Sequence, residues 1–231
     1  MSTIFPRWTN RLPAILLLVV LGGGSSAVGL VWYYFTPKFW EVGYMPTQPG
    51  GGFSHQLHAG KLGMDCRYCH THVEESPEAN IPNVATCYGC HAEGRLQLPP
   101  EQHAKSQFVR DAYEADASIE WRRVHKLPDY VRNFPHDVHV NAGVSCYSCH
   151  GAIVNQEVVH QVEPLSMAWC LECHRDPTPH LVPRQLVTDL LEVERRLKDT
   201  ETQAKAGPEL LRALASEPLH LLPDNCGACH Y

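Results

Sequence analysis

Cysteine spacing constrains this chain more than any other feature. All ten cysteines fall into Cys-x-x-Cys pairs, and a histidine follows each pair directly. The pairs are Cys66/Cys69, Cys87/Cys90, Cys146/Cys149, Cys170/Cys173 and Cys226/Cys229, followed by His70, His91, His150, His174 and His230. Only 15 of the 231 residues are histidine, so five such placements are not expected by chance. Cys-x-x-Cys-His is the attachment motif for c-type haem.

Disulfides and structural zinc are the two alternatives for paired cysteines. Disulfides are common in exported proteins, and the 17 residues between Cys69 and Cys87 would suit a zinc site. Neither needs a histidine directly after every pair. Haem c does, because two thiols form thioethers to the two vinyl groups of one porphyrin and the adjacent histidine then ligates the iron. We therefore expect five covalently bound haem c groups.

An internal repeat indicates the second axial ligands. Phe53-Ser-His55-Gln-Leu-His58 precedes Cys66, and Phe134-Pro-His136-Asp-Val-His139 precedes Cys146, with an offset of 81 residues between the histidines. Histidines at positions i and i+3 are neighbours on one helical turn, from which they could reach two different irons. A zinc site at one pair is the alternative, but the recurrence favours His55, His58, His136 and His139 as distal ligands.

The fifth distal ligand has two candidates, His125 and Met167. Methionine in this position would raise the reduction potential. The alternatives are that the histidine hydrogen-bonds a haem propionate and that the methionine packs against a porphyrin. A ligand exchanged between two copies, or an iron with an open position, would also fit.

The N-terminal segment predicts a membrane anchor. Residues 12–35 carry no charge, and 24 helical residues are enough to cross a hydrocarbon core of about 30 Å. Arg7 and Arg11 place the N-terminus in the cytoplasm, so the haem domain faces the periplasmic or outer side of a bacterial cytoplasmic membrane. Aromatic residues from Trp32 to Trp40 predict an interfacial belt. A signal peptide cleaved near Ala27 is the alternative.

The remaining chain predicts a multihaem cytochrome c, mostly coil with short α-helices wrapped round five haems and little strand. Residues 99–121 are expected to be partly helical, and 184–205 to form one helix that Gly207-Pro208 ends. The expected segments are a cytoplasmic N-terminus (1–11), a transmembrane helix (12–35), a linker (36–52), a first two-haem unit (53–98), a connector (99–133), a second two-haem unit (134–183), and a helix with the fifth haem (184–231).

Net charge argues against one class of partner. Nineteen Lys and Arg residues face 25 Asp and Glu residues, which gives −6 at pH 7. Nucleic-acid binding depends on basic surfaces, so a nucleic-acid partner is not expected.

These motifs together resemble the pentahaem cytochrome c subunit of alternative complex III, a bacterial quinol-oxidising membrane complex. The similarity covers nearly the whole chain, and the segment from Leu165 to Arg175 around the fourth motif is more specific than haem motifs alone. The chain departs from the family pattern at Gln156 and His160, where methionine and an aromatic residue are expected. His160 therefore becomes a third candidate for the fifth distal ligand.

The resemblance implies a relay subunit rather than a catalyst on its own. Electrons from quinol would arrive through iron–sulfur and polytopic quinone-binding subunits and leave to a cytochrome c or blue-copper acceptor, in a respiratory or photosynthetic chain. The alternatives are an autonomous membrane-anchored quinol dehydrogenase and a multihaem reductase of a small inorganic substrate. The reductase would need an iron with a vacant axial position, and the supply of strong ligands argues against one.

Overall fold

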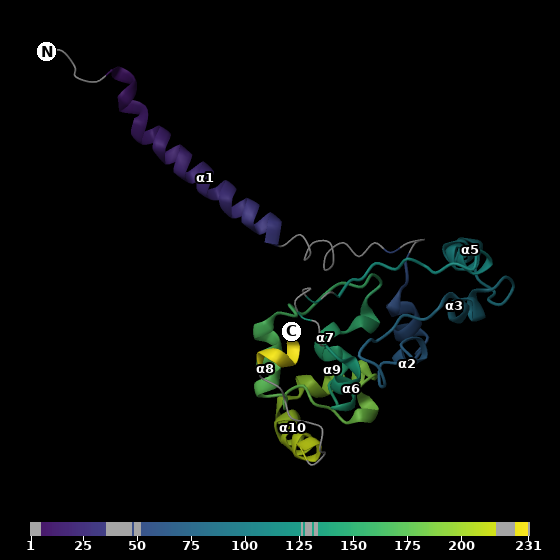
Figure 1. The fold of residues 1–231 in the computed structure, drawn as a ribbon. Coiled ribbons are helices and arrows are strands. Elements are labelled where there is room, and N and C mark those ends of the chain that lie inside the picture. The colour runs from purple at the N-terminus through teal and green to yellow at the C-terminus, as the bar shows by residue number, and fades with distance from the viewer. Residues whose placement is uncertain are drawn as a thin grey trace.

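The structure is a computed structural model that describes residues 6–35, 48, 52–125, 127, 131, 134–215 and 225–230. Figure 1 shows one long helix, α1 (Leu12–Phe35), standing apart from the short helices that carry the cysteine motifs. A 3₁₀ turn, η1 (Arg7–Arg11), precedes it. The predicted bounds of this helix are confirmed, and it is long and apolar enough to cross a membrane, with none of its apolar window buried. Most of the expected linker and Phe39 and Trp40 of the aromatic belt lie outside the described residues.

Each cysteine pair lies on a short helix. In four of the five, the residue before the helix accepts a backbone N–H bond with its side chain, which satisfies a donor that the first helical turn leaves open. These N-cap residues are Asp65, Asn83, Ser145 and Ser166. The helices are α2 (Cys66–Cys69), α3 (Val84–His91), α7 (Cys146–His150), α8 (Met167–Arg175) and α11 (Cys226–Cys229).

The two His-x-x-His segments are also helical. The first forms a π-helical turn, η4 (Gln56–Lys61), which His55 caps, and the second forms α6 (His136–Asn141). The first turn packs directly on η5 (Ile153–Asn155) of the second unit. The approach is so close that a Cβ on Gly60 would clash with the carbonyl oxygen of Val154. Glycine at this position therefore permits the close contact between the two units.

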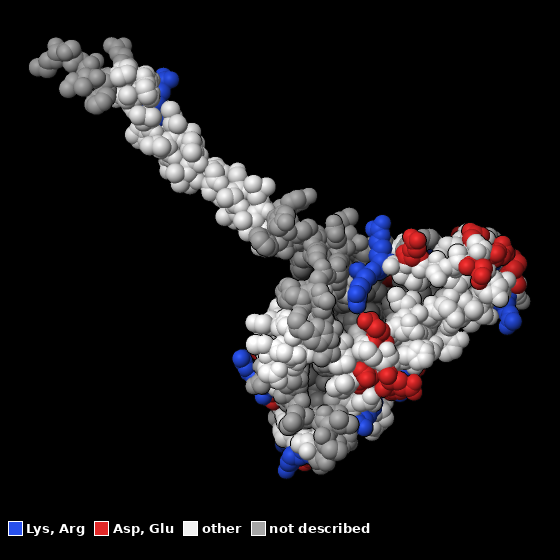
Figure 2. Space-filling view, in the orientation of Figure 1, with Lys and Arg blue, Asp and Glu red and all other residues white. Residues whose placement is uncertain are grey.

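The connector is partly helical, as predicted. It contains α4 (Pro100–Lys105) and α5 (Gln107–Glu114), and α5 packs on α3. The rings of Tyr88 and Tyr113 stack between these two helices with centroids 3.7 Å apart and planes 6° apart. Acidic side chains gather on the surface over α5 (Figure 2).

The prediction of one helix over residues 184–205 is wrong. The structure has three elements there, η6 (Arg184–Leu186), α9 (Leu190–Lys198) and α10 (Thr200–Ala215). Asp189 caps the start of α9, and Asp199 separates α9 from α10 by accepting bonds from Thr202. Short acidic side chains compete for backbone N–H groups in this way and so restart helices. Pro208 lies inside α10 and does not end it.

A small aliphatic core joins the two units to α9. It consists of Val73 from the first unit, Val140 and Val182 from the second, and Val187 and Val193 beside and within α9. Among the described residues the only strand-like pairing is an isolated bridge between Val144 and Leu181, so the expectation of little strand is confirmed. So small a core is consistent with a chain built around large apolar cofactors.

Candidate haem sites

None of the ten cysteines forms a disulfide, and each pair shares one face of a helical turn. In α2 the turn continues into the following histidine, because His70 donates its backbone N–H to Cys66 O at 2.8 Å. Among the described residues no group of three or more His, Cys, Asp or Glu side chains is arranged to hold a metal ion.

Two histidine pairs have the separation that a shared iron requires. The ring centroids of His58 and His91 are 6.1 Å apart, and those of His139 and His174 are also 6.1 Å apart. A metal–imidazole bond of about 2 Å on each side, added to the distance from nitrogen to ring centre, gives about 6 Å. Both pairs join a predicted distal histidine to the proximal histidine of the second motif in its unit. The residues present therefore fit a six-coordinate haem at these two places.

Hydrogen bonds orient the distal rings of these pairs. His58 Nδ1 lies 2.9 Å from Ser54 O, and His139 Nδ1 lies 2.7 Å from Pro135 O. A carbonyl oxygen only accepts, so Nδ1 carries the proton in each case and Nε2 keeps the lone pair that a metal needs. Both backbone partners lie four residues before the histidine, so the repeat preserves the tautomer as well as the sequence.

A phenylalanine holds each His-x-x-His pair from the same side. The Phe53 ring stacks on His58 (4.4 Å, 20°) and meets His55 edge-on (4.9 Å, 84°). In the second unit, Phe134 makes the same two contacts, at 4.7 Å and 25° with His139 and at 5.1 Å and 88° with His136. Each phenylalanine ring therefore contacts both imidazoles of its pair, one face to face and the other edge-on, in the same arrangement in both units.

The other predicted ligands gather between the two units. The pKa of His150 is lowered to about 3 by burial and by its neighbours His125, His136, His70 and His55. Burial, followed by the charges of His70, His58 and His125, lowers the pKa of His55 to about 4. His150 and His55 are therefore neutral imidazoles near neutral pH, the form that ligates iron.

Several of these buried nitrogens make no hydrogen bond to the part of the chain that the structure describes. They are His55 Nδ1, His91 Nδ1, His125 Nε2 and His150 Nδ1. A buried polar atom is costly to leave unpaired. For His125, whose Nε2 is the atom left open, an iron would supply the missing partner.

The three candidates for the fifth distal ligand differ in burial. His125 places its Nε2 in the interior, whereas the Met167 side chain is 64% exposed and His160 is also exposed. The His125 ring centroid lies 4.2 Å from that of His150, which is too short for an iron between those two rings. Gln156, which departs from the family pattern, is buried and accepts the His160 backbone N–H at 3.1 Å.

The cysteine pairs follow one another through the domain. The thiol of Cys146 is hydrogen-bonded with that of Cys66. This bond, together with burial, raises the pKa of Cys146. Burial raises the pKa of Cys87, with Cys69 adding to it, and raises the pKa of Cys149 to about 12, with Cys173 and Cys170 adding to it. Cys229 contributes in the same way to the raised pKa of Cys170, after burial. The motifs are therefore neighbours in the order second, first, third, fourth, fifth.

The sequence analysis did not identify Arg110. Its side chain is buried beside His91, and among the described residues it is the only charged residue in the buried class. Its sequence surroundings, between Val109 and Asp111, do not distinguish it from a surface arginine. Two other arginines near haem motifs or predicted ligands differ from it, because Arg175 is exposed and Arg123 lies on the surface 3.9 Å from Glu78.

Comparisons with known proteins find similarity to multihaem cytochromes. Residues 132–231 match the family described as cytochrome c7 and related cytochrome c. The chain is 30% identical over 135 residues to the menaquinone reductase multihaem cytochrome c subunit of Nitratidesulfovibrio vulgaris. The aligned region covers 56% of this chain and 59% of that protein. The chain thus spans less than two thirds of the length of this curated relative. The C-terminal part of this chain is therefore similar to multihaem proteins of the cytochrome c7 kind.

Proposed function

We propose that this protein is a membrane-anchored pentahaem cytochrome c that relays electrons from quinol oxidation in a membrane complex to an acceptor on the outer side. The observation that carries the proposal is the repeated pair of histidines 6.1 Å apart, His58 with His91 and His139 with His174. Similarity to a multihaem subunit named for menaquinone supports the link to quinone.

The chain's residues have defined roles in this proposal. The ten cysteines hold the porphyrins, the five motif histidines are proximal ligands, and His55, His58, His136 and His139 are distal ligands. Of the candidates for the fifth distal position, His125 fits best, because its Nε2 is buried and unpartnered within the described residues. Bound haem c supplies one-electron redox chemistry. The protein tunes it through ligands, burial and nearby charge.

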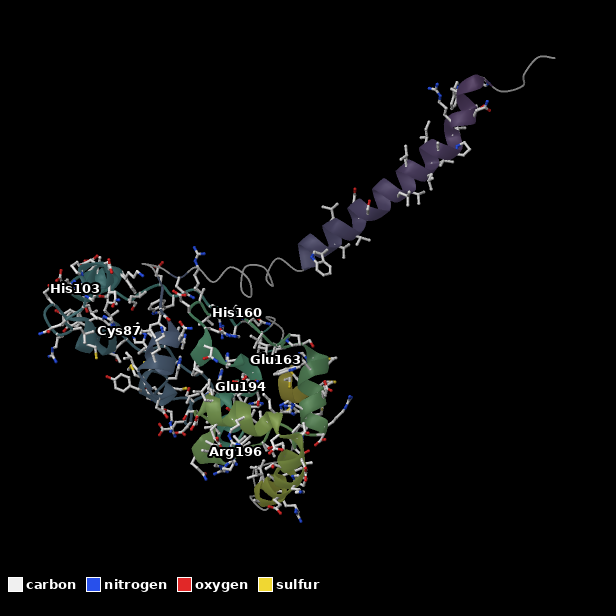
Figure 3. All side chains as sticks on the ribbon, turned by 180° about the vertical axis from the view of Figure 1, so that it is seen from behind. Cys87, His103, His160, Glu163, Glu194 and Arg196 are labelled. Atoms are coloured by element: carbon white, nitrogen blue, oxygen red, sulfur yellow. The ribbon has the colours of Figure 1, made fainter. Side chains whose placement is uncertain are left out.

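The order of the motifs suggests the path of the electrons. The second motif, on α3, lies at one end of the domain, and α8 and α11 lie at the other, with α2 and α7 between them (Figure 1). Figure 3, seen from behind, places Cys87 and His103 together at the first end, away from His160. Electrons that enter at either end would therefore pass through every haem in turn.

The anchor and the partners complete the proposal. Helix α1 would hold the haem domain at the outer face of the membrane, beside iron–sulfur and polytopic quinone-binding subunits. A signal peptide would export the same domain without anchoring it. The printed name of the relative, menaquinone reductase, favours a second candidate, in which the same relay carries electrons to menaquinone instead of from quinol.

Purification of the haem-loaded chain from its native membrane after mild solubilisation tests the proposal. Membrane partners should co-purify, and a quinol analogue should reduce the haems of the complex but not those of the isolated chain. If the isolated chain oxidises the quinol by itself, it is an autonomous dehydrogenase. If quinol does not reduce the haems of the complex, while a reduced cytochrome or copper protein does, electrons flow toward menaquinone.

A further inference from the structure

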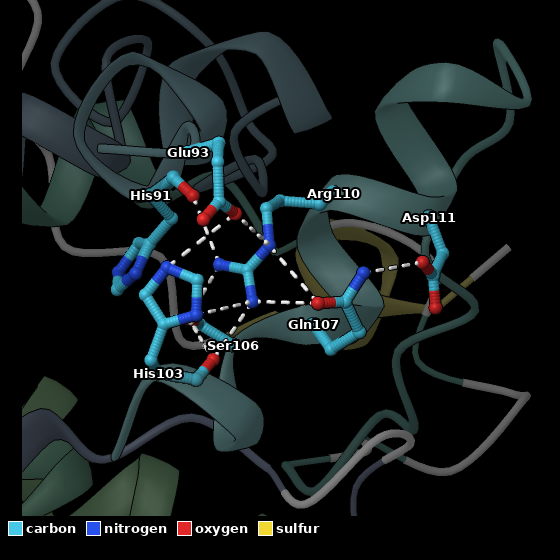
Figure 4. Close-up of polar contacts among 7 residues, drawn as sticks. All are labelled: His91, Glu93, His103, Ser106, Gln107, Arg110 and Asp111. Atoms are coloured by element: carbon cyan, nitrogen blue, oxygen red, sulfur yellow. Dashed lines mark hydrogen bonds and ion pairs between the residues drawn. The ribbon is translucent and has the colours of Figure 1, made fainter. Parts of the chain in front are cut away.

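Arg110 is held rigidly against the proximal histidine of the second motif (Figure 4). Its guanidinium donates to His91 O at 3.2 Å, to Ser106 Oγ at 3.1 Å and to His103 O at 2.8 Å. Gln107 Oε1 accepts two further bonds, at 3.1 Å from Nε and at 2.7 Å from Nη2. The residue is 3% exposed. With its donors used inside the protein, this arginine is a fixed buried charge rather than a mobile partner for a propionate.

The buried charge is only partly balanced. Glu93 Oε2 lies 3.6 Å from Arg110 Nε, but the Glu93 side chain is 78% exposed and therefore well screened by water. The other groups that face the guanidinium are His103, whose Nδ1 is 3.2 Å away, and neutral oxygens. Asp111 bonds Gln107 Nε2 at 2.8 Å on the outer side of the cluster. A positive potential therefore remains at the His91 backbone.

The repeat provides an internal comparison. His139 and His174 reproduce the ring separation of His58 and His91, so the haems at the second and fourth motifs would have the same ligands in the same arrangement. In the part of the chain that the structure describes, no other charged residue reaches the buried class. The two sites, matched in ligands and ring separation, thus differ by one buried cation.

We propose that Arg110 is a positioning residue that raises the reduction potential of the haem at the second motif above that of its repeat equivalent at the fourth. Electrons within the relay would then flow toward the end that carries the second motif. Reduction adds one negative charge to a haem, and a nearby fixed cation favours that step. Two unit charges about 10 Å apart, at an effective dielectric constant of about 20, change an equilibrium constant roughly tenfold. For a one-electron couple this corresponds to about 59 mV.

The proposal rests on the proposed function, and the two can fail separately. Iron and haem analysis of the purified full-length chain shows first whether five haems are bound. If they are not, the proposed function fails. If five are bound, redox titration followed by visible spectroscopy tests Arg110 alone.

Four variants make the titration decisive. Arg110→Gln should lower the potential of one haem by about 59 mV, the tenfold change given above, while Arg110→Lys, which keeps the charge, should restore most of it. Glu93→Gln removes the facing carboxylate and should shift the same potential upward. Arg95→Gln is the matched control, because Arg95 is an exposed arginine four residues after His91, and its loss should move no potential.

The shifted haem can be identified in a His58→Met background, where a methionine ligand gives the second haem its own spectrum and a higher potential. The Arg110→Gln shift should fall on that haem. A shift on another haem, or five unchanged potentials in a fully loaded Arg110→Gln protein, would overturn the proposal. If that variant does not load, the proposal is overturned instead when the haem lost on replacing Cys87 and Cys90 has a potential no higher than that of the haem lost on replacing Cys170 and Cys173.

Discussion

The hydroxyl of Ser145 donates a hydrogen bond of 2.7 Å to the carbonyl oxygen of Val187, 42 residues away, and both residues are buried. The next residue along, Thr188, donates its hydroxyl to Asp65 Oδ2 at 2.9 Å. Ser145 and Asp65 are equivalent positions of the repeat, and each caps the helix of the first haem motif in its unit. One short segment before α9 therefore holds both helices in place.

Replacing Ser145 by alanine should destabilise the domain by about 2–4 kcal/mol. The change removes an N-cap, worth about 1 kcal/mol, and leaves the buried Val187 carbonyl unpaired, which costs about 1–3 kcal/mol. Chemical denaturation of the haem-loaded protein measures it. Ser118→Ala, at an exposed position, should change stability by less than about 0.5 kcal/mol. Equal effects of the two substitutions would mean that the contact to Val187 is unimportant.

Asp65 predicts a pH dependence. The side-chain hydrogen bond from Arg67 lowers the pKa of Asp65 from its usual 3.8 to about 2. A carboxyl whose folded pKa is depressed stabilises the fold above its unfolded pKa and loses this effect as pH falls toward the folded value. Asp65→Asn should therefore be less stable than the wild type at pH 6, and the difference should shrink from pH 4 downward. Denaturation curves at several pH values would refute this if the difference stayed constant.

Gly60→Ala should separate the two units. Its Cβ would clash with Val154 O, and overpacking of this kind costs about 1–3 kcal/mol. Gly89→Ala is the matched control, because Gly89 is helical and nothing lies within 4 Å of an added Cβ. There the helix propensity of alanine should be neutral or slightly stabilising. Thermal unfolding compares the two, and a Gly60→Ala protein as stable as Gly89→Ala would show that the backbone contact is not tight.

Local sequence signals predicted the parts of this molecule that depend on near neighbours. The uncharged run from Leu12 to Phe35 gave the helix its bounds, and the offset of 81 residues identified His58 and His139 as equivalent positions. Which proximal histidine lies opposite each of them was not predictable from the sequence; the structure places His91 and His174 there. Each of these signals lies within a few residues or within one repeat.

Two kinds of feature were missed: local side-chain bonds that restart a helix, and long-range packing. Asp189 and Asp199 break the helix expected over 184–205 by capping new helices, and a hydrophobic period does not reveal such side-chain bonds. Arg110 resembles a surface residue in sequence, and its burial follows from how α5 packs on α3. The choice among His125, Met167 and His160 likewise depends on which side chain the fold turns inward.

The central claim is that the five motifs carry five haems with two strong axial ligands each. The most direct measurement is the haem and iron content of the purified chain, together with the EPR spectrum of its oxidised form. The account predicts five haems per chain with low-spin signals, and the loss of one haem when Cys87 and Cys90 are both replaced by alanine. Fewer than five haems, or a spectrum dominated by high-spin iron, would contradict it.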